Sequence, residues 1–441
     1  MKLYPERSET AAGMAEAMQA GLTTSVQIVE TCLSRIDDRE SELHAWVSVD
    51  REGALATAAE CDRERAAGTI RGPLHGIPIC IKDIVDVSGM VTGAGSPLMS
   101  MGPAADRDAE LVALLRDAGA VILGKTVTTQ FACFDPPPTR NPWNLSHTPG
   151  GSSSGSAAAV AAEMCPVAIG SQTGGSITRP AAFCGVFGCK PSFGTVSVDG
   201  VVPIAQSLDH PGPIGRSVED LAIVLSVLQR AETSDAGVPQ NETTPPRIGR
   251  LRGFHEELVN PELKASIDRA LDTLMAAGCL VYDIDVPDGF DELTDKHRLI
   301  MAAGAAAWHR ERFAKHRDDY GPCVASLIEE GLAASATDYI KALEHQAVMS
   351  ERMNALFGDG LDVLLTPATI GPAPDASSTG NPAMNAPWSY TGLPTVSLPI
   401  AISAEGLPLA IQLAGRLNGD VELLRASAFC ERVLRGNPRR E

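Results

Sequence analysis

The amino-acid sequence predicts an α/β fold in which a sheet carries helices on both faces. Apolar segments short enough to be buried strands alternate along the chain with segments whose apolar residues recur at helical spacing. Glycines close two of the expected helices, at Gly119 and Gly278, and an extended segment follows each of them. Such alternation of helix and strand is typical of a sheet covered by helices on both faces.

The N-terminal region, about residues 8–66, is expected to be helical and to pack outside the sheet. Between Ser8 and Asp37 it is rich in alanine and carries apolar residues at helical spacing. The turn-forming residues Gly21–Thr24 interrupt this pattern, so we expect two helices over this stretch.

A catalytic core is expected over about residues 70–230. Ile77–Ile81 and Ala120–Leu123 are short apolar segments that predict strands. Between them lies an expected helix, whose apolar face is formed by Leu111, Leu114, Leu115 and Ala118. These elements form one α/β unit.

The second half of the chain is expected to leave the sheet and return to it. The polar stretch Glu232–Arg247, with three prolines, predicts a long surface connection. A mostly helical insertion follows over about residues 255–358, and it includes a helix–strand unit at Ser266–Val286. Returning strands and a C-terminal helix occupy about residues 360–436, with strands at Val363–Leu365, Thr395–Ile402 and Leu407–Leu413. We therefore expect residues 1–441 to form a single domain.

Charge and composition narrow the classes of function. The net charge is −19, from 36 basic and 55 acidic side chains, and no run of Lys or Arg is long enough to follow a phosphate backbone, so nucleic acid is not an expected partner. The sequence has no apolar run near the length of a membrane span and no secretory signal at its start, so we expect a cytoplasmic protein without membrane contact. Ten scattered cysteines without a CxxC pair predict reduced thiols.

The segment Pro149–Pro180 concentrates the residues that carry chemistry. Its first seven residues have the composition of a flexible linker. The residues that follow contradict that interpretation, because Ser156–Met164 predicts a helix and Cys165–Ile169 a strand. A helix and a strand of similar length can run back on one another, which would bring Ser152 close to Ser176.

Ser176 stands in a turn suited to acyl chemistry. The turn Thr173–Ser176 contains two glycines directly after a strand, so its backbone N–H groups can converge on one point. Converging N–H donors beside a serine hydroxyl are what a tetrahedral acyl intermediate requires.

Lys82 is a candidate base for the serine. None of the nine histidines stands out, whereas Lys82, one of only eight lysines, directly follows an apolar strand. Burial would lower its pKa and leave an amine able to accept a proton. The other interpretation is a structural lysine paired with Asp83 or another acid, and the residues alone leave both open.

Four long motifs resemble the amidase-signature family: GIPICIKDI, GKTVTTQFA, NPWNLSHTPGGSSSGSAAAVAA and TGGSITRPAAFCGVFGCKPSFG. The likeness extends from Leu22 to the C-terminal segments GLPTVSLP and GLPLAIQLAG. It implies the amidase-signature fold, with a large, mixed, twisted sheet, and a catalytic triad of a serine, a cis-serine and a lysine.

Carried onto this chain, the resemblance implies Ser176 as nucleophile, Ser152 as proton relay and Lys82 as base. It also implies a cis peptide bond between Gly151 and Ser152, with Ser153 supporting the relay by hydrogen bonding. The N–H groups around Thr173, Gly174, Gly175 and Ser176 would form the oxyanion hole. No metal or other cofactor is expected.

The chain departs from the common family pattern beside the nucleophile. Many members carry Asp at position 172 and Arg at position 178, where this chain has Gln172 and Thr178. The neighbouring Arg179 is a candidate to compensate for the missing arginine.

Three other motifs compete with this interpretation. Gly119–Thr126 satisfies the phosphate-binding pattern GxxxxGK[ST], but its intervening residues predict a strand. Gly151–Gly155 satisfies GxSxG with Ser153 as nucleophile, but no strand precedes it. His255–Val259 lacks the second histidine of a zinc-binding HExxH, and no SxxK motif of penicillin-binding enzymes occurs.

The expected substrate is a small or aryl amide, with carbamates (urethanes) and esters as further candidates. Gln130, Phe131 and Cys133 are expected to border the acyl pocket, and Trp388 its entrance, although ordinary packing explains these residues equally well. The sequence is compatible with a homodimer. The alternative functions are an amidotransferase-type subunit and an inactive subunit of a larger complex.

Overall fold

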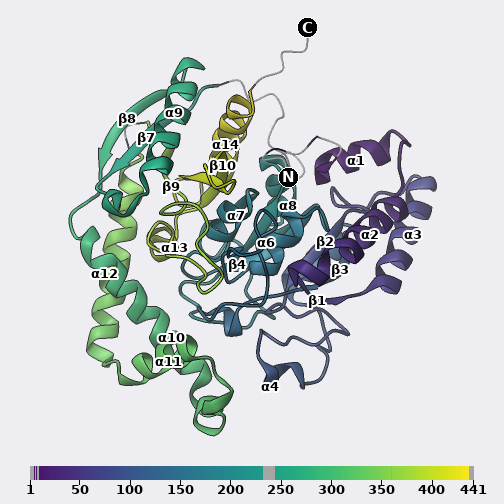
Figure 1. The fold of residues 1–441 in the computed structure, drawn as a ribbon, viewed down its shortest axis with the longest axis horizontal. Coiled ribbons are helices and arrows are strands. Elements are labelled where there is room, and N and C mark those ends of the chain that lie inside the picture. The colour runs from purple at the N-terminus through teal and green to yellow at the C-terminus, as the bar shows by residue number, and fades with distance from the viewer. Residues whose placement is uncertain (1–3, 5, 7–8, 232–243, 359, 437–441) are drawn as a thin grey trace.

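The computed structural model describes residues 4, 6, 9–231, 244–358 and 360–436. Its centre is one 11-stranded mixed sheet with helices on both faces, as Figure 1 shows, which confirms the predicted fold class. The strand order is β1-β3-β2-β4-β6-β5-β10-β11-β9-β7-β8. Neighbouring strands run parallel around β2 (Pro78–Lys82) and β7 (Arg247–Arg252), and antiparallel through the middle of the sheet.

The remaining strands are short, and most are buried on both faces. They are β1 (Trp46–Val49), β3 (Val121–Thr126), β4 (Val167–Gln172), β5 (Phe187–Lys190), β6 (His210–Gly215), β8 (Leu280–Asp285), β9 (Val363–Pro367), β10 (Thr395–Ile402) and β11 (Pro408–Ala414). The helices of the first half are α1 (Ala11–Gln19), α2 (Ser25–Leu43), α3 (Arg51–Ala66), α4 (Pro97–Ser100), α5 (Glu110–Asp117), α6 (Ser154–Ala161), α7 (Thr178–Cys184) and α8 (Val218–Leu228). Those of the second half are α9 (Pro261–Ala276), α10 (Leu293–Lys315), α11 (Pro322–Ala333), α12 (Ala336–Ala355), α13 (Ala386–Thr391) and α14 (Asp420–Leu434).

The two faces of the sheet bury separate hydrophobic cores. In β4, Val167 and Ile169 belong to the larger core, whereas Ala168 between them belongs to the smaller one. Successive side chains of a strand point to opposite faces, so this alternation places apolar residues on both sides. Helices α1, α5, α8, α9 and α14 contribute to the larger core, and α2, α3, α6 and α7 to the smaller one.

The two N-terminal helices are present and are interrupted where the sequence predicts. Helix α2 begins after Thr24, whose side chain accepts a hydrogen bond from the Gln27 backbone while the Gln27 side chain accepts one from the Thr24 backbone. This reciprocal cap satisfies two N–H groups at the start of the helix, and so it fixes the point at which the helix begins.

Strand β3 contradicts the phosphate-binding interpretation of Gly119–Thr126. The strand runs from Val121 to Thr126, through the GKT residues that a phosphate-binding loop would need, and all its residues are buried. Lys125 forms an ion pair with Asp83 at 3.0 Å instead of facing an open loop.

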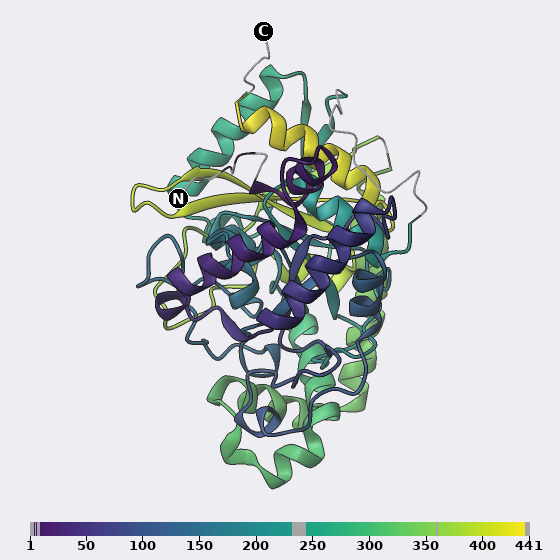
Figure 2. The same cartoon turned by 90° about the vertical axis from the view of Figure 1, so that its right-hand side faces the viewer.

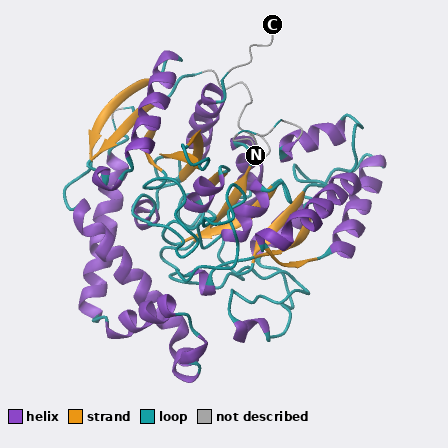
Figure 3. Ribbon diagram, viewed as in Figure 1, coloured by secondary structure: helices purple, strands orange, loops and turns teal. Residues whose placement is uncertain are grey.

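The region expected to be a mostly helical insertion contains helices and one strand. Helices α10, α11 and α12 form a lobe that extends away from the sheet, visible in Figures 1, 2 and 3. Strand β8 lies within the expected helix–strand unit at Ser266–Val286 and pairs with β7 at the sheet edge. The predicted surface connection at 232–247 falls largely on residues 232–243, outside the described part of the chain. No helix of the described residues is both long and apolar enough to cross a membrane.

Candidate active site

Lys82 is the last residue of β2, and it is fully buried. Its Nζ donates hydrogen bonds to Ser152 Oγ at 2.7 Å and to Ser171 Oγ at 2.8 Å. Asp83, the acid that might have paired with it, is occupied by Lys125. Lys82 therefore has two serine hydroxyl groups as its partners rather than the neighbouring carboxylate.

Burial changes the protonation of Lys82. Desolvation disfavours the ammonium form and lowers the pKa of Lys82 to about 7, although the nearby Asp209 carboxylate opposes this shift. A lysine with this pKa is largely neutral in mildly alkaline solution. Its amine can then accept a proton from the Ser152 hydroxyl.

Ser152 and Ser153 lie just before α6, and the peptide bond between Gly151 and Ser152 is cis, as the family resemblance implies. Ser153 is buried, and its Oγ both donates to the Ser171 carbonyl and accepts from the Ser171 N–H, each at 3.2 Å. A nucleophile elbow requires an exposed hydroxyl, so the GxSxG interpretation of Ser153 is wrong. Ser153 fastens the serine-rich loop to β4.

The turn Thr173–Ser176 connects β4 to α7, and its carbonyl groups are held by more distant elements. The Thr173 carbonyl accepts a hydrogen bond from His297 Nε2 at 2.9 Å, and the Gly174 carbonyl accepts one from Ser389 Oγ at 3.0 Å. Within the described residues, no protein group accepts a hydrogen bond from the N–H groups of Gly174, Gly175 or Ser176. These donors are available to a substrate oxyanion.

Thr173 also links the turn to a buried acid. Its Oγ1 donates to Asp209 Oδ1 at 2.5 Å, while Asp209 Oδ2 accepts from the N–H groups of Ile204 and Ala205. Burial raises the pKa of Asp209 to about 6, against the opposing effect of these hydrogen bonds. Asp209 anchors the turn through the Thr173 side chain, whereas His297 contacts the Thr173 carbonyl.

Gln172, which stands where many family members carry Asp, caps the start of α7. Its Oε1 accepts hydrogen bonds from the N–H groups of Ile177 at 2.9 Å and Thr178 at 3.0 Å, and from Thr178 Oγ1 at 3.1 Å. Its Nε2 donates to Ser389 Oγ. A neutral amide thus satisfies the first N–H groups of α7 and fixes the turn that carries Ser176.

We expect the Gln172→Ala variant to be less stable by about 2–4 kcal/mol, because two buried backbone N–H groups would lose their acceptor. Urea unfolding followed by circular dichroism measures this change. Gln229→Ala is the control, since it removes one bond to Thr195 and should cost about 1 kcal/mol or less. Equal destabilisation by the two variants would contradict the capping role.

Arg179 lies in the first turn of α7 and is buried. Its Nη2 donates to the Gly151 carbonyl at 2.8 Å, so it braces the loop that carries Ser152. No hydrogen bond joins it to Gln172 among the contacts of the described chain, so it does not substitute for the arginine that position 178 lacks.

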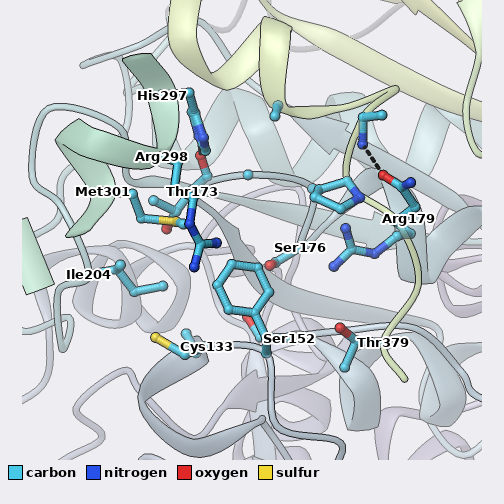
Figure 4. A pocket seen from close by; sticks show the side chains of 18 of the residues that line it. Cys133, Ser152, Thr173, Ser176, Arg179, Ile204, His297, Arg298, Met301 and Thr379 are labelled. Carbon is cyan, nitrogen blue, oxygen red and sulfur yellow. Dashed lines mark hydrogen bonds between the residues drawn. The ribbon is translucent and has the colours of Figure 1, made fainter. Parts of the chain in front are cut away.

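A cavity of about 330 Å³ opens over the two serines, and Figure 4 shows its wall. It is lined by Ser152, the turn Thr173–Ser176, residues of α10 and the segment before α13. The lining residues are Ala132, Cys133, Phe134, Ser152, Thr173, Gly174, Gly175, Ser176, Arg179, Ile204, Thr294, His297, Arg298, Met301, Thr379, Asn381, Pro382, Ala383 and Ala386.

Of the four residues expected at the substrate pocket, only Cys133 lies on the cavity wall. Phe131 is buried behind it and stacks on Tyr320, with ring centroids 5.2 Å apart. Trp388 is also buried and stacks on Phe254. Gln130 ties the wall to the helical lobe through bonds to Asp319 and Gly321.

Several residues of the site carry no signal in the local sequence. Ser171, which bonds both Lys82 and Ser153, is one position from the end of β4, and no motif marks it. His297 comes from α10, far along the chain, and reaches the turn only through the folding of the helical lobe. Hydrophobic periodicity does not predict such contacts between residues that are far apart in the chain.

One cluster of metal-ligand side chains lies outside the cavity. Among the described residues, Cys61, Glu64 and His75 bring their ligand atoms within 4.8 Å of one another. Arg71 already holds the Glu64 carboxylate through two hydrogen bonds of 2.7 Å, and His75 Nε2 faces the Cys61 carbonyl at 2.9 Å. These contacts explain the cluster as a structural network.

Comparison with known proteins assigns the family. The family model "Amidase" matches residues 27–424. The chain is 33% identical to a subunit of the glutamyl-tRNA(Gln) amidotransferase of Agathobacter rectalis, covering 97% of this chain and 94% of that protein. It is 34% identical to an amidase of Pseudomonas putida, covering 96% of each.

Among solved structures, the native peptide amidase of Stenotrophomonas maltophilia aligns with a TM-score of 0.83, 31% identity and 97% coverage of both chains. A chain from a vestigial protein complex connected with the origins of an s-triazine catabolic enzyme aligns with a TM-score of 0.89 and 30% identity, covering 97% of this chain and 98% of that one. The chain therefore belongs to the amidase family and is an enzyme that acts on carbon–nitrogen bonds.

Proposed function

We propose that the enzyme hydrolyses small or aryl amides, including carbamates, through an acyl-enzyme on Ser176, with hydrolysis of esters as a side activity. The observation that carries this proposal is the contact of the fully buried Lys82 with Ser152 at 2.7 Å, in a cavity that both serines line. A neutral lysine beside a serine relay supplies the proton acceptor that a serine nucleophile needs.

In the first half of the reaction, Ser176 Oγ attacks the carbonyl carbon and passes its proton to Ser152, whose own proton moves to Lys82 Nζ. The oxyanion that forms accepts hydrogen bonds from the N–H groups of the Thr173–Ser176 turn. The relay then returns the proton to the leaving nitrogen, the C–N bond breaks, and the free amine departs.

In the second half, a water molecule attacks the Ser176 ester, and the same relay removes a proton from it. Collapse of the second tetrahedral intermediate breaks the bond to Ser176 Oγ, which regains a proton from Ser152. Lys82 returns to its neutral form, and the products are an amine together with a carboxylic acid from an amide, or with a carbonic acid monoester from a carbamate. Ser171 positions Lys82 by accepting a hydrogen bond from its Nζ, and Ser153, the residue after the relay serine, bonds to the Ser171 backbone.

The relatives favour a second candidate, a component of an amidotransferase. Several of them are glutamyl-tRNA(Gln) amidotransferase subunits at 32–34% identity, although an amidase matches at 34% over a similar share of the chain. The net charge of −19 disfavours direct contact with tRNA. We therefore prefer an enzyme that acts without partner proteins.

Turnover by the purified chain alone separates the two functions. We expect it to release arylamine from anilides and aryl carbamates without nucleotide, tRNA or a second protein, and to retain this activity in the presence of a chelator. Release of the amine is followed by absorbance, with a matched aryl ester included in the panel. Activity that appeared only on glutamine, and only with partner subunits, would instead establish the amidotransferase role.

A further inference from the structure

The cavity over Ser176 contains positive charge and no acid. Its two charged lining residues are Arg179 and Arg298, and none of the described lining residues is Asp or Glu. Arg298 is already neutralised, because it forms two hydrogen bonds of 2.8 and 2.7 Å with the Glu330 carboxylate. Arg179 is therefore the lining arginine whose charge is not balanced by a carboxylate.

Arg179 is buried without an anionic partner. It is 2% exposed, no ion pair joins it to a carboxylate in the described chain, and its Nε and Nη1 have no hydrogen-bond partner. Burial lowers the pKa of Arg179 to about 10, so the guanidinium remains charged at neutral pH. A buried charge without an opposite charge is costly, and a protein keeps one chiefly where function requires it.

Asn385, which lies near this side chain, does not supply the missing charge. Asn385 Oδ1 is also buried without a partner, and both it and Arg179 Nη1 lie close to Gly175, at 2.7 and 3.0 Å from the position of a Cβ there. No hydrogen bond joins these two atoms in the described chain, and an amide oxygen carries no charge that would balance the guanidinium. A carboxylate would both accept hydrogen bonds from the guanidinium and balance its charge.

Arg179 is placed to meet the acyl part of a substrate. The Arg179 N–H donates to the Gly175 carbonyl at 3.0 Å, so this turn is helical and Arg179 follows Ser176 by three residues. Side chains three apart on a helix are neighbours, with Cβ atoms about 5–6 Å apart. Figure 4 shows both side chains reaching into the cavity. An acyl group bonded to Ser176 Oγ would therefore lie beside the guanidinium.

We propose that Arg179 binds a carboxylate on the acyl side of the substrate, so that the preferred substrates are half-amides of short dicarboxylic acids. This inference rests on the proposed function, because it requires the acyl group to be carried by Ser176. The cavity volume of about 330 Å³ favours a compact acyl group. Two parallel N–H···O bonds from the guanidinium would orient the carboxylate.

The first test compares substrates that differ only in charge. Succinamic acid and malonamic acid each carry one carboxylate, and the diamides succinamide and malonamide are their neutral counterparts of nearly equal shape. We expect wild-type kcat/KM to be at least about 100-fold higher for the acids, and this ratio to fall to about one in Arg179→Gln, because charge-assisted hydrogen bonds would be lost. Arg179→Lys should recover part of the preference.

The second test measures occupancy without turnover. Succinate and malonate should slow the labelling of Ser176 by a fluorophosphonate in the wild type, whereas the two diamides should not. In Arg179→Gln, each rate is compared with that of the same variant without ligand, and we expect the protection by dicarboxylates to disappear. Circular dichroism and thermal unfolding verify that the variant is folded.

Three outcomes would overturn the inference. Equal kcat/KM for acids and diamides in the wild type, without protection by dicarboxylates, would refute it while Ser176 labelling still supports the acyl-enzyme. An equal loss on both substrate classes in Arg179→Gln would show that Arg179 acts only through its bond to Gly151. Absence of Ser176 labelling together with absence of amide turnover would refute the proposed function, and the inference with it.

Discussion

In the Ser176→Ala variant, kcat for an amide is expected to fall by at least about 10⁴-fold, since the variant has no oxygen to form the acyl-enzyme. The fold should survive, because the Ser176 hydroxyl faces the cavity. The hydrogen bond from the Ser153 N–H goes to the Ser176 backbone carbonyl, which the substitution leaves in place. Initial rates with one good amide substrate, measured at several enzyme concentrations, give the change.

Ser154→Ala is the matched control for this loss. Ser154 belongs to the same serine-rich segment, but its hydroxyl donates to the Gly150 carbonyl and lies outside the cavity. We expect its kcat to stay within about tenfold of wild type, because only one neutral hydrogen bond is removed. Near-normal activity in Ser176→Ala would require a different nucleophile.

Replacement of Lys82 by methionine is expected to lower kcat/KM by about 10²–10⁴-fold, because it removes the proton acceptor of Ser152. Methionine has nearly the same length and no charge, so the buried site remains filled. The Ser152 and Ser171 hydroxyl groups would each lose one partner. Rate measurements across a pH series check the role as well as the size of the loss.

The sign of the pH dependence follows from the role of a base. Lys82 must be neutral to accept a proton, and its pKa is lowered to about 7, so wild-type kcat/KM should rise through about pH 7 and level off above it. Lys82→Met should lose this inflection. Lys125→Met, which alters a buried lysine paired with Asp83, should destabilise the protein but keep the inflection. An inflection that persists in Lys82→Met would contradict the assignment.

The fold could be predicted from the sequence where strands are apolar and helices are periodic. The segments at Ile77–Ile81 and Thr395–Ile402 correspond to β2 and β10, because strands buried on both faces are largely apolar in sequence. Strand β6 was not predicted, because the prolines and glycines of its sequence, HPGPIG, are typical of a turn. Its neighbours β4 and β5 impose the extended conformation, which is a tertiary effect.

The site was predictable in its motifs and not in its surroundings. Lys82 and Ser152 are in contact as the family motifs imply, and Ser152 and Ser176 share one cavity. The residues around them depend on distant segments: His297 reaches the Thr173–Ser176 turn from α10. Phe131 and Trp388 are buried in the core and do not line the cavity, because large aromatic side chains gain most by burial.

The central claim is that Ser176, and not another serine of the segment, carries the acyl group. Reaction of the intact protein with a fluorophosphonate, followed by digestion and peptide mass mapping, tests this claim most directly. The account predicts a single adduct on Ser176, which is absent from Ser176→Ala and forms more slowly in Lys82→Met. An adduct on Ser152 or Ser153, or undiminished labelling of Ser176→Ala, would contradict it.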